Sequence, residues 1–137
     1  MALIHLDAGV LIGFLDGDDA HHQAAGTVIG EALDQGDRLA MAASALAECL
    51  VGPARRGDEA IELVHDLRRR LPIEVVDLDV GIATAAARLR AGHRSLRLPD
   101  ALVIATAFER DADELITTDR RWPDTNELGA GRAIRVI

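Results

Sequence analysis

The sequence predicts a three-layer α/β/α fold with a central, mainly parallel sheet of four to five strands. Short apolar runs of strand length alternate with stretches of helical periodicity, which is typical of parallel sheets covered by helices on both faces. The chain of 137 residues is 49% hydrophobic, enough to bury the core of one domain spanning residues 1–137. We find no repeat, low-complexity tract or linker that would divide it.

The first part of the chain contains two strand-like runs separated by helical patterns. The expected elements are a strand over 3–6, helices over 10–15 and 20–35, and a strand over 39–43. Ser44 is a favourable N-cap for the next helix, because its hydroxyl can accept a bond from a free N–H of the first turn. Gly52-Pro53 is expected to interrupt that helix, since proline lacks the donor that a helix interior needs.

The second part continues the same alternation. The expected elements are a helix from 57 to 70, a strand over 73–76, a helix over 80–91, a helix from 98 to about 110, and strands over 114–117 and 133–136. The start of the helix at Leu98 is the clearest signal, because Pro99 lies in its first turn and Asp100 follows directly. The last strand is expected at the edge of the sheet.

Four acidic residues fall where a parallel sheet would gather them at one edge. Asp7 and Asp119 follow strand-like runs, Glu48 lies in the helix after the second strand, and Asp100 lies at a helix N-terminus. Open parallel sheets bind ligands at the carboxyl ends of their strands. Carboxylates crowded there repel each other unless a cation lies between them. The pattern therefore predicts a divalent metal such as Mg²⁺ and chemistry on a substrate that carries phosphate.

Each of the four acids also has an ordinary structural explanation. Asp7 could cap a helix, and Asp100 could stabilise a helix through its dipole. Asp119 could belong to a turn, and Glu48 could be a surface residue. The metal site is therefore expected from the joint arrangement and not from any one residue.

Hydroxyl groups near these acids are candidates for supporting roles. Thr117, Thr118 and Ser44 can orient the acids or their ligands through hydrogen bonds. Either Glu48 or Asp119 could orient an attacking water or accept its proton.

Four arginines flank two of the acids, namely Arg94, Arg97, Arg120 and Arg121. They could hold substrate phosphates near the metal. Charge balance around an acidic pocket explains them as well. His21-His22, in contrast, lacks the spacing of four residues that places two imidazoles on one helix face, and we interpret it as a solvated helix start.

Composition excludes several classes of function. The net charge of −8 argues against broad, nonspecific binding of nucleic acid. All 15 positive charges are arginines, and the absence of lysine excludes P-loop NTPases, response-regulator receivers and haloacid-dehalogenase-like phosphatases. The aromatic content of two Phe, one Trp and no Tyr argues against a stacking platform for single-stranded bases.

The cellular location is expected to be the cytoplasm. The single cysteine, Cys49, rules out an internal disulfide framework and suits a reducing compartment. No apolar run approaches the roughly 20 residues of a membrane helix, so no membrane association is expected. The N-terminus also lacks the pattern of a signal peptide.

The segments that carry these residues resemble the motifs of PIN-domain ribonucleases, in particular the VapC toxins of bacterial toxin–antitoxin pairs. The matching segments are 6–12, 18–25, 44–48, 98–107 and 115–122. The most specific is LPDALVIATA at 98–107, and the resemblance covers essentially the full length of the chain.

The resemblance implies a metal-dependent endoribonuclease. It assigns the catalytic acids to Asp7, Glu48, Asp100 and Asp119, with Asp7, Asp100 and Asp119 on Mg²⁺ or Mn²⁺. The implied activity is endonucleolytic cleavage of RNA of the tRNA or rRNA class. Thr117 falls where the family often places a hydroxyl beside the metal.

The resemblance also implies protein partners. A homodimer is expected, together with a cognate VapB-like antitoxin that lays a C-terminal segment over the toxin and directs an arginine into the acidic pocket. The acidic net charge suits a basic partner. The alternative is a noncatalytic PIN-like binding module that only pairs with a partner.

Two positions depart from the family pattern. Gly9 stands where Ser or Asn is frequent, so a supporting hydrogen bond is expected to be missing, and Trp122 replaces the usual Phe. Neither departure removes one of the four acids.

Overall fold

The structure is a computed structural model and describes residues 1–124, 127–128 and 133–137. In chain order its elements are β1 (Leu3–Leu6), α1 (Ala8–Leu15), α2 (His22–Asp34), β2 (Arg38–Ala42), α3 (Ala43–Arg56), α4 (Asp58–Arg70), β3 (Glu74–Val76), α5 (Val80–Gly92), α6 (Leu98–Glu109), β4 (Glu114–Thr117) and β5 (Ala133–Val136).

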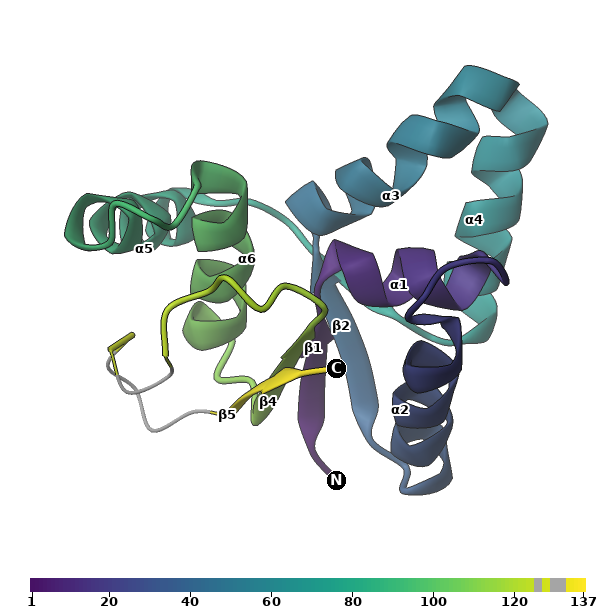
Figure 1. Ribbon diagram of the computed structural model, residues 1–137, viewed down its shortest axis with the longest axis horizontal. Helices are drawn as coiled ribbons and strands as arrows, with labels where there is room; N and C mark the ends of the chain where they lie inside the picture. Colours follow the sequence, from purple (N-terminus) through teal and green to yellow (C-terminus); the bar gives the residue numbers. More distant parts are fainter. Residues whose placement is uncertain (125–126, 129–132) are drawn as a thin grey trace.

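The five strands form one parallel sheet in the order β3-β2-β1-β4-β5. Helices α5 and α6 lie on one side of the sheet, and α1 and α2 lie on the other (Figure 1). Helices α3 and α4 form an arm that extends beyond the sheet (Figure 1). The predicted three-layer fold is confirmed, and β5 forms the predicted edge strand.

The centre of the sheet places two polar residues side by side at its carboxyl edge. In the parallel pair of β1 and β4, Leu6 aligns with Ile116. The next residues are Asp7, directly after β1, and Thr117, the last residue of β4. The backbone N–H of Asp7 donates to the carbonyl of Ile116 at 2.9 Å. The register of these strands therefore determines that the two side chains leave the sheet together.

A well-packed core holds this edge in place. Leu6, Ile104, Leu115 and Ile116 are each at most 1% exposed. Complete burial of such a side chain contributes roughly 1.5–3 kcal/mol to stability. The residues that follow β1 and β4 are therefore carried by the most deeply buried part of the sheet.

Two sequence predictions about α3 are wrong. Its N-cap residue is Ala42, which makes no side-chain capping bond, and Ser44 lies within the first turn. Pro53 does not interrupt the helix, which continues to Arg56. Because Pro53 lies in the last turn and its ring is buried, only one bond near the helix end is lost. The helix instead ends at Gly57, whose φ of 117° strongly favours glycine.

Among the described residues, no helix combines the length and the apolar character that are needed to cross a bilayer.

Candidate functional site

Asp7 is the buried centre of the acidic edge. It follows β1 and is the N-cap of α1, where its Oδ1 accepts the N–H of Ala8 at 2.8 Å. Its Oδ2 accepts the hydroxyl of Thr117 at 2.7 Å. Only 8% of Asp7 is exposed, so its carboxylate is withdrawn from water.

The Thr117 hydroxyl connects two of the predicted acids. Its Oγ1 donates to Asp7 and accepts the backbone N–H of Asp119 at 3.0 Å. Thr117 is itself completely buried at the end of β4. The hydroxyl therefore fixes the Asp7 carboxylate against the start of the segment that carries Asp119.

Glu48 and Asp100 act electrostatically on Asp7. Glu48 lies in α3, and Asp100 lies in the first turn of α6. Burial is the main reason that the pKa of Asp7 is raised to about 6; the negative charges of Glu48 and Asp100 contribute to this rise, and the hydrogen bonds from Thr117 and Ala8 oppose it. Burial and the charge of Asp100 also raise the pKa of Glu48. These three carboxyl groups therefore repel one another, as the sequence pattern predicts.

Asp119 is in a different electrostatic state. Its two carboxylate oxygens accept bonds from Nε and Nη2 of Arg121, each at 3.1 Å. These bonds lower the pKa of Asp119. The carboxylate is thus already paired with a cation from its own chain, which agrees with the interpretation of the flanking arginines as charge balance for the acids.

The acids do not form a closed metal cage as their side chains stand. Over residues 1–124, 127–128 and 133–137, no three acidic, His or Cys side chains converge to metal-binding distance. This arrangement still fits Mg²⁺, which commonly takes only one or two protein carboxylates and keeps several waters. The mutual repulsion of the three acids is the property that a divalent cation would relieve.

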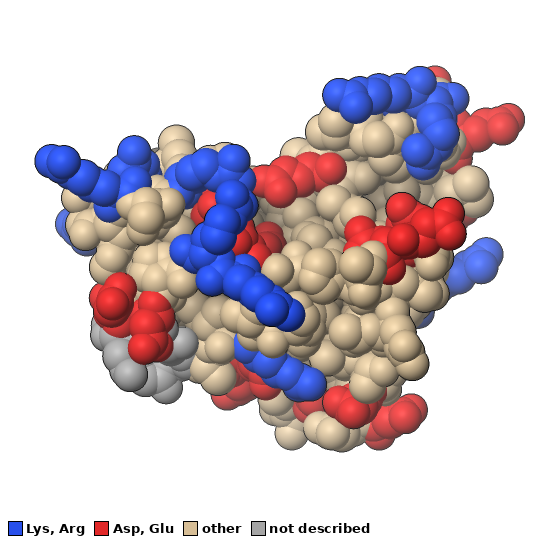
Figure 2. Space-filling view, viewed as in Figure 1, with Lys and Arg blue, Asp and Glu red and all other residues tan. Residues whose placement is uncertain are grey.

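The other candidate side chains surround this edge. Ser44 is half-buried in the first turn of α3, and in the described part of the chain its hydroxyl makes no hydrogen bond. Arg97 Nε lies 3.6 Å from Asp100 Oδ2, and Arg120 is exposed beside Asp119. In Figure 2, blue side chains gather where α6 and the segment after β4 lie, directly beside red ones.

The space above Gly9 explains its departure from the family pattern. A Cβ atom at Gly9 would fall on the hydroxyl oxygen of Thr118, and it would lie 3.3 Å from the Thr118 Cβ. A hydroxyl group therefore occupies this space although residue 9 has no side chain.

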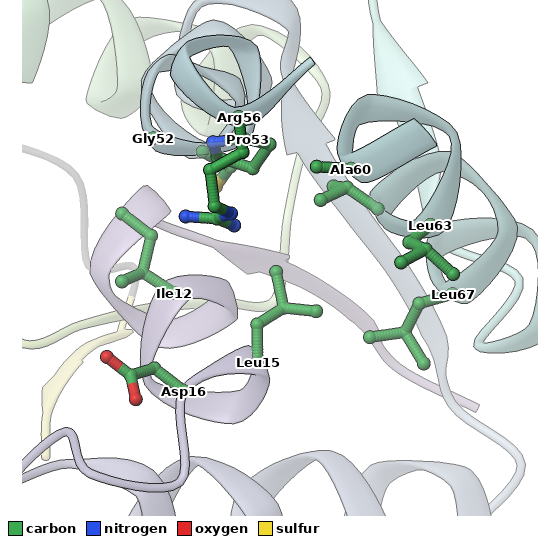
Figure 3. Close-up of a pocket in the computed structure, with 11 residues that line it drawn as sticks. Ile12, Leu15, Asp16, Gly52, Pro53, Arg56, Ala60, Leu63 and Leu67 are labelled. Carbon is green, nitrogen blue, oxygen red and sulfur yellow. The ribbon is translucent and has the colours of Figure 1, made fainter. Parts of the chain in front are cut away.

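A separate apolar groove lies between α1, α3 and α4. It encloses about 680 Å³, and Figure 3 shows Ile12 and Leu15 on one side and Ala60, Leu63 and Leu67 on the other. Leu63 is 70% exposed although it is apolar. Exposed apolar surface of this kind marks sites where a protein or ligand docks. The groove does not include the four acids.

Cys49 at the base of the groove is a packed core residue. Its Sγ donates to the carbonyl of Ala8 at 3.6 Å. Burial raises the pKa of its thiol to about 12, which keeps it in the unreactive thiol form. A nucleophilic role for Cys49 is therefore excluded at neutral pH.

Solved structures of other proteins share the fold of this chain. The chain is similar to the VapBC2 complex of Rickettsia felis bound to a fragment of its promoter DNA (13% identity, 98% of each chain, TM-score 0.72). It is also similar to the DNA-bound VapBC of Salmonella typhimurium (17% identity, 99% of this chain and 98% of that chain, TM-score 0.72). A third similar structure is VapC20, a sarcin–ricin loop cleaving toxin of Mycobacterium tuberculosis (17% identity, 94% and 95%, TM-score 0.66).

Sequence comparison gives the family itself. No curated protein matches the chain. The family model of the PIN domain, however, matches residues 4–128. This range includes all four acids and most of the chain. The protein therefore belongs to the PIN domain family.

Proposed function

We propose that this PIN domain is a Mg²⁺- or Mn²⁺-dependent endoribonuclease and the toxin of a type II toxin–antitoxin pair. The observation that carries the proposal is the buried Asp7 carboxylate, which Thr117 fixes and which Glu48 and Asp100 repel. Such a cluster of like charges destabilises the folded protein, and clusters of this kind are typical of functional sites. A bound cation would offset the repulsion. The VapC structures with the same fold support this assignment.

The proposed ligands are Asp7, Asp100 and Asp119. A cation at Asp119 has to share the carboxylate with Arg121, which bonds both of its oxygens. When bound, the cation would lower the pKa of a coordinated water and offset the charge of the substrate phosphate.

Glu48 is the proposed proton acceptor. Glu48 is an exposed residue, and its carboxyl group, although partly withdrawn from water, can still be reached by water at the acidic edge. Its raised pKa makes it a better base than an ordinary glutamate. Thr117 keeps Asp7 in position, and Ser44 offers a further hydroxyl at the same edge.

Arginines next to the acids would bind the phosphate. Arg97 lies beside Asp100, and Arg121 lies beside Asp119. A guanidinium group can hold two phosphate oxygens at once. The negative phosphate can therefore approach the acids with a positive charge on each side.

The direct test compares RNA cleavage by the wild type, Asp7→Asn and Glu48→Gln, with and without Mg²⁺, on a panel of tRNA and rRNA fragments. We expect Mg²⁺-dependent cleavage by the wild type only. Equal cleavage by all three would indicate contamination or another site. No cleavage by any of them across the panel would favour the noncatalytic binding module.

We further propose that a VapB-like antitoxin binds in the apolar groove of Figure 3. Two of the similar structures are VapBC complexes. The groove offers a partner exposed apolar side chains such as Leu63 and Leu15, and Asp16 and Arg56 at its rim can pair with polar groups. The net charge of −8 favours a basic partner.

The partner proposal can be tested by coexpression with the product of the adjacent reading frame. Leu63→Asp should abolish copurification, because it places a charge in the groove. Leu78→Asp is the control, since Leu78 is also exposed (53%) and does not line the groove. Equal loss of the complex with both variants would contradict the location. Light scattering on the purified chain tests the homodimer that we propose alongside this complex.

A further inference from the structure

A second pocket opens next to the acidic edge. It encloses about 450 Å³ and is lined by His21, Thr118, Asp119, Arg120 and Arg121. Asp119 belongs to both sites, whereas the other four residues lie outside the proposed metal ligands. The pocket therefore adjoins the candidate catalytic site at Asp119.

The walls of this pocket supply mainly hydrogen-bond donors. Arg120 and Arg121 are exposed, and Arg121 uses only two of its five N–H groups on Asp119. Thr118 adds a hydroxyl, whose position depends on the missing side chain of Gly9. Two guanidinium groups and a hydroxyl are the usual partners of a phosphate group.

His21 is held in place by Asp19 in the preceding turn and by helix α1. Asp19 Oδ1 accepts its backbone N–H at 2.8 Å and lies 3.3 Å from its Nδ1. Gly13 of α1 packs closely against it, since a Cβ at Gly13 would lie 3.3 Å from the His21 Cβ. The neighbouring His22 also contacts α1, with its Nδ1 2.9 Å from the carbonyl of Gly13. This segment is therefore more than the solvated helix start that the sequence suggested.

The position of His21 brings a helix end to the pocket as well. His21 is the N-cap residue of α2 and makes no side-chain capping bond. The positive end of the α2 dipole therefore lies at the pocket wall and adds to the attraction of the two arginines for an anion.

We propose that His21, Thr118 and Arg120 bind a phosphodiester group of the RNA strand next to the one that is cleaved, with Arg121 lying between the two phosphates and shared by them. This inference rests on the proposed ribonuclease function and assigns a further substrate contact to it. Because Asp119 belongs to both sites, the two sites adjoin, and a strand held at the acidic edge can place its neighbouring phosphate in the pocket. Such a contact would select for a strand that continues beyond the cleaved bond.

The test measures RNA binding and not cleavage. Binding of a labelled, mixed-sequence single-stranded RNA to the Asp7→Asn protein is followed at several salt concentrations. The slope of log K against log[salt] is negative, and each lost phosphate contact reduces its magnitude by about 0.7 for a single strand. Arg120→Gln should reduce the magnitude of the slope by about this amount. His21→Ala should weaken binding about threefold, as expected for one lost hydrogen bond.

Arg70→Gln is the matched control. Arg70 is exposed at the end of α4 and does not line this pocket, so the same loss of charge should leave the slope unchanged. Equal slopes for Arg120→Gln and Arg70→Gln would overturn the inference and leave the ribonuclease proposal intact. Absence of both RNA binding by Asp7→Asn and cleavage by the wild type would instead overturn the ribonuclease proposal. Weakened binding of the protein partner by Arg120→Gln, with an unchanged RNA slope, would assign the pocket to that partner.

Discussion

Replacement of Asp7 by Asn should stabilise the metal-free protein while it removes activity. Burial raises the pKa of Asp7 from its ordinary value of 3.8 to about 6, and the charges of Glu48 and Asp100 contribute to the shift. Between these two pH values the native state binds a proton more readily than the unfolded state. The stability that protonation contributes is therefore fully present below pH 3.8 and is lost as the pH rises through about 6.

The magnitude follows from the size of this shift. A difference of roughly two pKa units at about 1.4 kcal/mol each means that the ionised Asp7 costs roughly 3 kcal/mol at neutral pH. Asn carries no charge but has one acceptor oxygen for the N–H of Ala8 and the hydroxyl of Thr117, which costs about 1 kcal/mol. The net gain is about 2 kcal/mol, or a rise in Tm of about 4–8 °C for a domain of this size.

Thermal unfolding in the presence of EDTA measures this gain. Asp7→Asn should melt above the wild type at neutral pH and should lose this advantage near pH 4, where the wild-type carboxyl is protonated. Asp37→Asn is the control, because Asp37 also accepts a backbone N–H, from Ala2, but lies outside the acidic edge. A variant that is no more stable than the wild type at neutral pH would refute the electrostatic reasoning.

Three further predictions concern catalysis, metal affinity and acid stability. Glu48→Gln should lower kcat for RNA cleavage by about 10²–10⁴-fold, the usual contribution of a general base, and leave the Kd for RNA nearly unchanged. Arg121→Ala should tighten Mn²⁺ binding in calorimetric titrations by up to about fivefold, because Asp119 loses its competing partner; Arg120→Ala removes the same charge without that bond and should have less effect. Burial lowers the pKa of His5 from 6.5 to about 4, so the unfolded state binds a proton more readily and stability should fall by roughly 3 kcal/mol as the pH drops between these values. Urea unfolding across this range should show a smaller loss for His5→Leu, and an equal loss would contradict the assignment to His5.

The parts of the site that follow from periodicity could be predicted from the sequence. Asp7 directly follows a short apolar run, so its place at the end of a parallel strand required only the strand to be recognised. Asp100 follows Pro99 in a helix start that few other patterns produce. The structure confirms that Asp7 follows β1 and that Asp100 lies in the first turn of α6. Both locations could be predicted because strand ends and helix starts depend on local signals.

The parts that depend on side-chain direction could not be predicted in this way. Nothing in the spacing of Asp119 and Arg121 shows that the arginine turns back onto the acid, since both lie in a segment without periodicity. The contact of Thr118 with the space above Gly9 joins residues more than a hundred positions apart. The continuation of α3 past Pro53 likewise reflects tertiary burial of the ring, which local propensity does not contain.

Asp7 and Asp119 are held in opposite electrostatic environments, and this difference affects how a cation would bind. Asp7 is ionised only at a cost that burial and its neighbours impose, whereas Asp119 is stabilised by an exposed arginine. A cation arriving at Asp7 relieves repulsion, but at Asp119 it must compete with Arg121 for the carboxylate. The first step therefore favours binding, and the second opposes it. Because Arg121 also lines the adjacent pocket, a phosphate in that pocket would compete with Asp119 for the guanidinium, so that RNA and metal binding should favour each other.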